Sequence, residues 1–156
     1  MNLKKVDWKV FLFFFLYTFI LAGIGVLLSG GFNLDELNKP PLAPPAWVFP
    51  VVWTILYSAM SIAAYLVFVS EDIDRGAPLR LYLLQVIVNV LWPVFFFGLE
   101  WLLFAFFWLL LLLALIALTM DGFRKISRPA FYLMVPYFVW VLFAGYLNIG
   151  FYLLNK

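Results

Sequence analysis

The chain has 156 residues, of which 67% are hydrophobic and only 12% are charged, and its mean hydropathy is +1.08. Because soluble domains carry about 25% charged residues, this composition excludes a soluble globular domain, and the net charge of +2 gives no reason to expect a nucleic-acid partner. The chain has no cysteine or histidine. Disulfides, thiol catalysis, histidine-based triads and conventional zinc or histidine-ligated haem sites are therefore excluded, and we expect no bound metal.

Five stretches without a charged residue fill most of the chain: 10–28, 47–70, 81–99, 101–120 and 129–155. A helix of roughly 20 residues crosses the hydrocarbon layer, and lipid permits only helices or closed barrels. A barrel strand would alternate apolar and polar residues, whereas residues 109–118 are continuously apolar. We therefore predict an all-α membrane protein, a five-transmembrane-helix bundle in a single domain (1–156), with helices at about 8–29, 46–70, 79–98, 100–121 and 129–154.

The first apolar stretch follows several lysines, as in a signal peptide, but it exceeds the usual length of about 7–15 residues and no small-x-small cleavage site follows. We expect a retained helix. Cations concentrate in the cytoplasmic connections of membrane proteins. With a cytoplasmic N-terminus, that side would hold Lys4, Lys5, Lys9, Arg75, Arg80, Arg124, Lys125 and Arg128, and the other side only Lys39 and Lys156. We expect this orientation, in the plasma membrane of a bacterium or an archaeon.

The connection after the first helix, residues 32–46, is the longest and has four prolines within six positions. Proline fixes φ and removes a backbone donor, so this segment should be extended and stiff. It is either a stiff spacer or a lid over one mouth of the bundle, because long irregular connections are often functional. The lid would be formed by Lys39, Pro40, Leu42, Pro44 and Pro45.

The remaining connections are short. Residues 71–78 form a charged turn, and the connection at 98–100 is so brief that the third and fourth helices should be antiparallel neighbours. The connection predicted at 121–128 is basic, which favours contact with anionic lipid head groups.

Polar residues within the predicted spans are candidates for a binding site, because an unpaired amide in hydrocarbon is costly and should face the bundle interior. Gln85 and Asn89 lie four residues apart on one helical face, with Trp92 one turn further on. The second and fifth helices carry stripes with the same spacing: Phe49, Trp53 and Tyr57, and Pro136, Trp140, Ala144 and Asn148. The amides could instead only join helices, which is the preferred interpretation for Gln85 and Asn148, whereas both interpretations stay open for Asn89.

Trp53 and Trp140 are the aromatic residues best placed for an internal wall. Aromatic residues make up 22% of the chain, and tryptophan and tyrosine collect at membrane interfaces whatever the function. Trp53 and Trp140, however, each share a helical face with a small or polar residue, as a slot for a planar ligand requires. No carboxylates are paired at a spacing that suggests a general acid and base, and no phosphate-binding loop occurs. The sequence therefore indicates a binding protein before a catalyst.

The order of these motifs resembles one known family over essentially the whole chain. The motifs are Lys39-Pro40-x-x-x-Pro44-Pro45-x-Trp47-Val48-Phe49, Val52-Trp53-Thr54-x-Leu56-Tyr57, Asn89-x-x-Trp92, and Pro136-Tyr137-x-x-Trp140-x-x-Phe143-Ala144-x-x-Leu147-Asn148. Together they resemble the translocator protein or tryptophan-rich sensory protein (TspO/MBR) family, formerly called the peripheral benzodiazepine receptor family.

The resemblance implies a five-helix bundle with a pocket under the first connection. Its ligands would be porphyrins, notably protoporphyrin IX, and isoquinoline- or benzodiazepine-type molecules, with no required cofactor; vertebrate members also bind cholesterol. The ligand-binding residues would be Trp53, Asn89, Trp92, Trp140 and Ala144, with Trp47 and Tyr57 nearby, and the candidate set also includes Gln85, Phe143 and Asn148. Asn33, Leu34 and Leu42 stand where the family often has aromatic residues, which leaves fewer rings in the predicted lid.

Three functions remain open at this point. The first is a binding protein for porphyrin or another planar apolar molecule. The second, also implied by the resemblance, is light-dependent porphyrin degradation in which Trp53 and Trp140 would be catalytic. The third is transport of porphyrin, lipid or sterol, or stress sensing through a partner protein. The resemblance also implies a homodimer in contact with membrane lipid.

Overall fold

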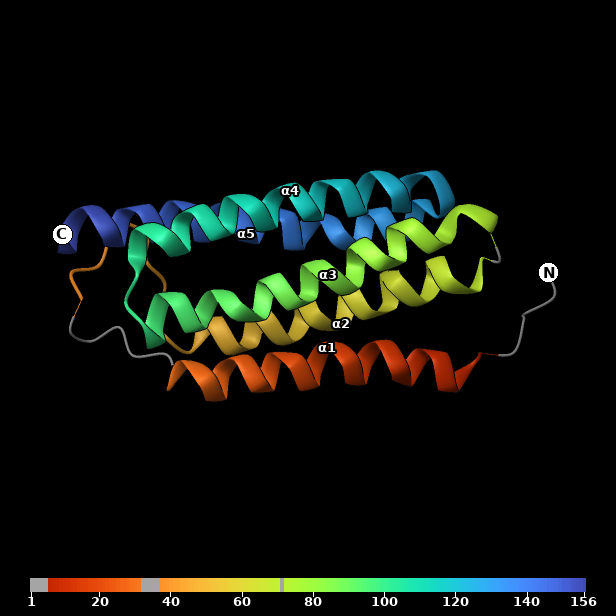
Figure 1. The fold of residues 1–156 in the computed structure, drawn as a ribbon, viewed down its shortest axis with the longest axis horizontal. Helices are drawn as coiled ribbons and strands as arrows, with labels where there is room; N and C mark the ends of the chain where they lie inside the picture. Colours follow the sequence, from red (N-terminus) through yellow and green to blue (C-terminus); the bar gives the residue numbers. More distant parts are fainter. Residues whose placement is uncertain (1–5, 32–36, 71) are drawn as a thin grey trace.

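The computed structural model describes residues 6–31, 37–70 and 72–156, which form a bundle of long helices running roughly along one axis (Figure 1). The long helices are α1 (Trp8–Ser29), α2 (Val48–Val69), α3 (Gly76–Pro93), α4 (Leu102–Ile126) and α5 (Arg128–Asn155). The short 3₁₀ helix η1 (Ile73–Arg75) precedes α3, and the π-helical turn η2 (Val94–Gly98) follows it. Five of the described segments are long and apolar enough to cross a membrane, so the prediction of a five-helix membrane bundle is confirmed.

Local sequence explains where the helices begin and end. The Asp7 side chain accepts hydrogen bonds from the backbone of Lys9 and Val10 and thereby caps α1. The same helix ends at Gly30, whose φ of 74° lies in the left-handed region that glycine adopts without steric cost. Ser127 has an extended backbone between α4 and α5, and its side chain accepts from the backbone N–H of Ala130 to cap α5.

Helix α4 is longer than the sequence predicted. We expected a connection over residues 121–128, but α4 continues to Ile126 and the connection shrinks to Ser127. The Asp121 carboxylate lies 2.6 Å from Lys125 Nζ, four residues later on the same helical face. Such a pair stabilises a helix, and basic residues favour a helix C-terminus. The charges therefore extend the helix.

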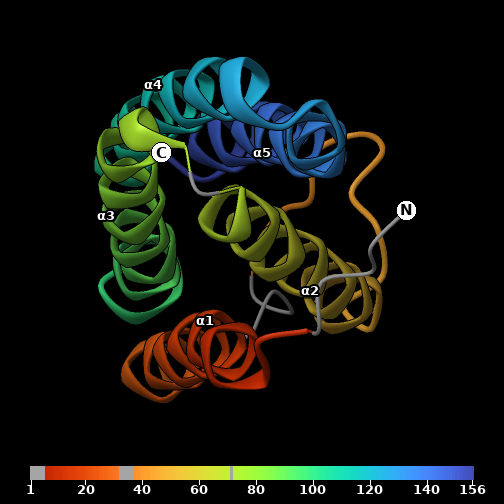
Figure 2. The same cartoon turned by 90° about the vertical axis from the view of Figure 1, so that its right-hand side faces the viewer.

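The helices are arranged in a ring in which α1 contacts α2 and α3, α2 contacts α5, α5 contacts α4, and α4 contacts α3 (Figure 2). Contacts between α3 and α4 confirm that these helices are neighbours. Large apolar side chains cover much of the outer surface, as lipid contact requires.

Helix α1 contacts α3 along most of its length but diverges from α2 toward its C-terminal end, and this arrangement creates the site described below. Near its C-terminal end, Gly25 lies so close to Val90 of α3 that no side chain would fit between the two backbones. Near its N-terminal end, Phe11 packs edge-on against Tyr65 of α2, with 5.4 Å between ring centroids. Described ring contacts between α1 and α2 extend no further than Phe19, so the C-terminal part of α1 approaches α3 rather than α2.

Candidate functional site: an apolar cavity between three helices

A cavity of about 510 Å³ lies between α1, α2 and α3. Its lining residues are Phe19, Ala22, Gly23 and Val26 from α1, Pro50, Trp53, Thr54 and Tyr57 from α2, and Asn89, Val90, Trp92 and Pro93 from α3. The volume falls within the range of about 300–1,000 Å³ that is typical of small-molecule sites. None of these lining residues is charged, so the cavity suits an apolar molecule.

Trp53 and Tyr57 form an aromatic wall on α2. They are four residues apart, and their rings are stacked with centroids 5.1 Å apart and an interplanar angle of 27°. Trp53 also meets the ring of Tyr137 on α5 edge-on at 6.2 Å. Contacts on both sides hold the indole in one orientation, which leaves a fixed surface toward the cavity.

Asn89 is the fixed polar group of the cavity. Its Oδ1 accepts a hydrogen bond from the Tyr57 hydroxyl at 2.9 Å, and its Nδ2 donates to the Tyr137 hydroxyl at 2.9 Å. Tyr137 in turn donates to Gln85 Oε1 at 2.7 Å. This chain of hydrogen bonds joins α2, α3 and α5 in the bundle interior. Because Nδ2 carries two hydrogens and donates one to Tyr137, one hydrogen remains available.

Gln85 lies outside the cavity lining and is fully buried. Its Oε1 accepts from Tyr137, whereas its Nε2 has no hydrogen-bond partner among the described residues. The helix-joining role expected for Gln85 agrees with this position, and a role in ligand binding stays a prediction.

Trp92 lines two separate hollows, of which the first is the main cavity. Its Nε1 donates a hydrogen bond to Asn148 Oδ1 at 2.9 Å. Asn148 Nδ2 in turn donates to the Leu102 carbonyl at 2.7 Å. Trp92, Ala144 and Asn148 also line a separate hollow of about 20 Å³. That hollow is large enough for about one water molecule and too small for a planar ring system.

Trp140 and Phe143 lie on the far side of α2 from α1, outside the lining of the main cavity. The Trp140 ring packs against Phe49 at 6.0 Å and against Phe143 at 5.6 Å. Its Nε1 is buried without a partner among the described residues. Trp47, at the start of α2, is 68% exposed and also lies outside the lining. The structure therefore places Trp53, but not Trp140, in the lining of the cavity, although we expected both to face one slot.

The described part of the predicted lid is fastened to the C-terminal end of α5. The backbone and side chain of Asn38 bond to the last turn of α5, where Asn155 Oδ1 accepts from the Asn38 N–H at 2.8 Å. Tyr146 donates to the Pro41 carbonyl at 3.0 Å, and buried Pro40 lies so close to Gly150 that a Cβ there would come within 2.6 Å of it.

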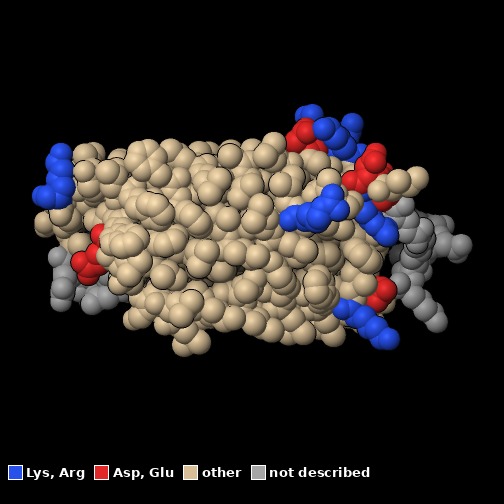
Figure 3. Space-filling model, in the orientation of Figure 1, with Lys and Arg blue, Asp and Glu red and all other residues tan. Residues whose placement is uncertain are grey.

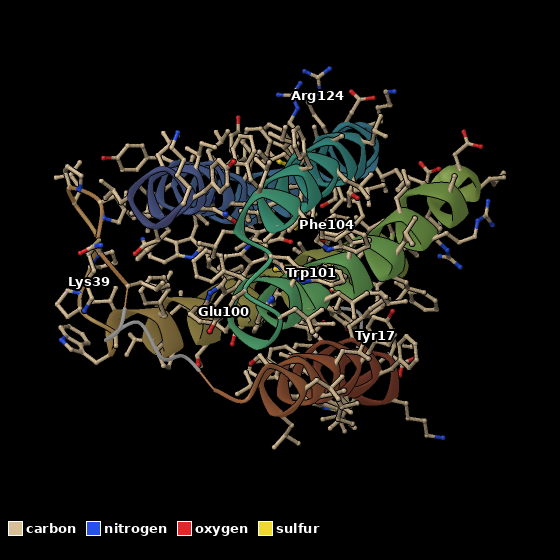
Figure 4. The ribbon with its side chains drawn as sticks, turned by 60° about the vertical axis from the view of Figure 1, so that its left-hand side comes forward. Tyr17, Lys39, Glu100, Trp101, Phe104 and Arg124 are labelled. Carbon is tan, nitrogen blue, oxygen red and sulfur yellow. The ribbon has the colours of Figure 1, made fainter. Side chains whose placement is uncertain are left out.

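None of the predicted lid residues lines the cavity: Lys39, Pro40, Leu42, Pro44 and Pro45 all lie outside it. Lys39 lies on this segment (Figure 4), and Leu42 is exposed with a φ of 66°. Asn33 and Leu34 lie outside the described residues. A lid over the cavity stays a prediction.

Sequence reasoning missed the residues that α1 contributes and the role of Tyr137. Ala22 and Gly23 had no signal beyond small size, which permits close helix approach, and Val26 had none beyond apolarity. Nothing in one sequence shows which face of α1 turns inward. Tyr137 did have a signal, because a tyrosine within an apolar span needs a hydrogen-bond partner. It lies three residues before Trp140, which received the attention instead.

Comparison with known proteins gives consistent matches along the chain. The family model described as the TspO/MBR family matches residues 14–153. The chain is 38% identical over 144 residues to the tryptophan-rich sensory protein of Cereibacter sphaeroides, covering 92% of this chain and 90% of that protein. It is 40% identical over 116 residues to the translocator protein of Ovis aries, covering 72% and 69%. With the TspO protein of Archaeoglobus fulgidus it shares 30% identity over 144 residues, covering 87% and 94%.

Proposed function

Because this chain is a membrane protein of the TspO/MBR family, we propose that it binds a porphyrin or a similar planar apolar ligand in the cavity between α1, α2 and α3. The observation that carries the proposal is a cavity of about 510 Å³ in which the stacked Trp53–Tyr57 wall lies near one fixed amide, Asn89. A flat aromatic ligand could stack on the Trp53–Tyr57 wall, and one acceptor at the edge of that ligand could accept a hydrogen bond from the Asn89 amide.

The membrane setting changes which interactions determine affinity. Lipid tails are as apolar as the cavity, so moving a ligand from lipid into the cavity gains little from the hydrophobic effect. Aromatic stacking does differ between the two environments, and an aromatic pair contributes about 0.5–1.5 kcal/mol beyond burial. The rings of Trp53 and Trp92 are therefore expected to provide most of the selectivity for planar molecules.

Asn89 would set the direction of the bound ligand. Tyr57 and Tyr137 hold its amide from two sides, so the remaining Nδ2 hydrogen is oriented before a ligand arrives. Preorganised donors lose little entropy on binding. Since the lining has no cation, an anionic group of the ligand would have to stay outside the cavity. The lining residues Gly23, Val26, Pro50 and Thr54 are exposed and mark the open side between α1 and α2.

A cavity-filling variant tests this proposal directly. Ala22 lines the cavity, so Ala22→Phe should abolish saturable binding of protoporphyrin IX, measured by its Soret absorbance in a detergent titration of the full chain. The matched control is Leu27→Phe on the same helix, because Leu27 is 82% exposed and faces away from the cavity. Equal affinity in wild type and Ala22→Phe would refute this cavity as the site.

Light-dependent degradation of bound porphyrin is the alternative function. The position of Trp53 favours it, because this indole lines the cavity in which the porphyrin would bind. In this arrangement Trp53, rather than Trp140, would meet the ligand. Loss of the Soret band under illumination should then slow in Trp53→Phe and stay unchanged in Trp140→Phe. Bleaching at the rate of free porphyrin in detergent would exclude the reaction.

We also propose that the N-terminus faces the cytoplasm. Lysine and arginine side chains gather at the end of the bundle that holds the N-terminus (Figure 3). The described cations there are Lys9, Arg75, Arg80, Arg124, Lys125 and Arg128, whereas Lys39 and Lys156 lie at the other end. This asymmetry follows the positive-inside rule.

A further inference from the structure

A basic hollow lies where α4 meets α5, at the end of the bundle that holds the N-terminus. It has a volume of about 340 Å³ and is lined by Arg124, Arg128, Phe131 and Tyr132. The Arg124 side chain points away from the bundle (Figure 4), and Tyr132 is 66% exposed. Two arginines and two aromatic residues therefore share one hollow at the ends of two helices that are long and apolar enough to cross a membrane.

An apolar groove continues from this hollow along the outer surface of α4 and α5. The groove has a volume of about 240 Å³, shares Arg124 and Phe131 with the hollow, and is also lined by Ala117, Met120 and Phe138. Arg124 and Ala117 are seven residues apart on α4, which corresponds to about 10 Å along a helix. The groove therefore leads from the charged end toward the middle of the membrane.

The local charges leave a net positive field. Asp121 also touches the groove, but its carboxylate pairs with Lys125 at 2.6 Å and lies 3.6 Å from Arg124. Among the described residues, Arg128 has no ion pair. Three cations and one carboxylate thus leave two uncompensated positive charges at this joint.

The position of Arg128 is unfavourable for the helix that carries it. It is the first residue of α5, where the helix dipole places partial positive charge and disfavours a cation. An anion between Arg124 and Arg128 would offset both the dipole and the mutual repulsion of the two guanidinium groups. Arginine also matches the geometry of a phosphate group through paired N–H donors.

We propose that this joint is a binding site for an anionic phospholipid. Arg124 and Arg128 bind the phosphodiester, and one acyl chain lies in the groove over Ala117, Met120 and Phe138. The charges select an anion, and the contiguous apolar groove selects a lipid over free phosphate. Basic pockets beside membrane helices are known to bind anionic lipid head groups.

Native mass spectrometry of the full chain in detergent tests the proposal, with dioleoylphosphatidylglycerol as the probe and dioleoylphosphatidylcholine as the neutral comparison. Replacing both arginines (Arg124→Gln with Arg128→Gln) should weaken phosphatidylglycerol binding roughly thirtyfold, about fivefold for each cation. The matched control, Lys9→Gln with Lys156→Gln, removes the same charge at positions remote from the joint, on α1 across the ring and at the opposite end of α5. It should change affinity by less than about threefold, because charges beyond a Debye length are screened. Equal losses in the two double variants would overturn the site, since general surface charge would then explain the binding.

A second variant tests the groove without changing any charge. Ala117 is exposed, so Ala117→Phe fills the groove without entering the core and should also weaken phosphatidylglycerol binding. Unchanged affinity would refute the acyl-chain part of the proposal. The soluble head group glycerophosphoglycerol distinguishes a lipid site from a site for a free phosphate compound. The proposal predicts that millimolar glycerophosphoglycerol does not displace bound phosphatidylglycerol. Displacement by glycerophosphoglycerol at the concentration at which phosphatidylglycerol itself binds would refute the proposal.

Discussion

Replacing Trp53 and Trp140 one at a time should separate two tryptophans that looked equivalent in the sequence. Trp53 lines the cavity and stacks on Tyr57 at 5.1 Å, whereas Trp140 packs against Phe49 and Phe143 outside it. Trp53→Leu removes one indole face from the ligand. Because the ligand is exchanged with lipid rather than water, the expected loss is mainly the stacking contribution of about 1 kcal/mol, or roughly fivefold in Kd.

Trp140→Leu is the matched control. It removes the same ring, and it breaks no hydrogen bond among the described residues because Trp140 Nε1 has no partner there. Its Kd for protoporphyrin IX should stay within about twofold of the wild-type value. The Soret absorbance of the porphyrin is the readout, since tryptophan fluorescence itself changes when an indole is removed. A larger loss of affinity in Trp140→Leu than in Trp53→Leu would refute the placement of the ligand between α1, α2 and α3.

Three further predictions follow from the interior contacts and the charge distribution. Asn89→Leu removes two hydrogen bonds and leaves the Tyr57 hydroxyl unpaired, so the free energy of unfolding should fall by about 1–3 kcal/mol and protoporphyrin IX should bind more weakly. Thermal unfolding in detergent checks the first effect, and an unchanged midpoint would contradict the network. Gly25→Ala should lower the free energy of unfolding by about 1–3 kcal/mol, because α1 must move away from α3. Gly23→Ala is the control and should be neutral, since no atom lies within 4 Å of its new Cβ. Equal unfolding midpoints for the two variants would be inconsistent with the close approach of α1 to α3. The chain has no cysteine, so single cysteines can report which side of the membrane each end of α2 faces. Leu42→Cys, before α2, should react with a membrane-impermeant maleimide in intact cells, whereas Ser70→Cys, after α2, should not. The reverse labelling would show that the proposed orientation is inverted.

The architecture was predictable from sequence because lipid imposes strong constraints. Five uncharged stretches of sufficient length leave few alternatives to five helices. The short connection between α3 and α4 also required those helices to be neighbours. Helix ends were less predictable: Asp121 and Lys125 looked like connection residues because they are charged, yet their spacing of four residues stabilises the final turns of α4.

The site was predictable in part, for a physical reason. Trp53, Tyr57, Asn89 and Trp92 lie on motifs with helical spacing, and the structure brings all of them to the cavity. Helical periodicity shows which residues share a face, but the rotation of each helix about its own axis depends on tertiary packing. The face of α5 with Trp140 therefore could not be placed from its stripe alone.

The C-terminal half of α1 shows the same limit more clearly. Its direction is set by the close approach of Gly25 to Val90, a contact between residues far apart in sequence. That contact brings Ala22 and Val26 to the cavity, although neither residue belongs to a motif.

A structure determined with protoporphyrin IX tests the central proposal most directly. The proposal predicts ligand density between α1, α2 and α3, in contact with the Trp53 ring and with one ligand acceptor within hydrogen-bond distance of Asn89 Nδ2. Density against Trp140 and Phe143, with the cavity beside Trp53 empty, would contradict it.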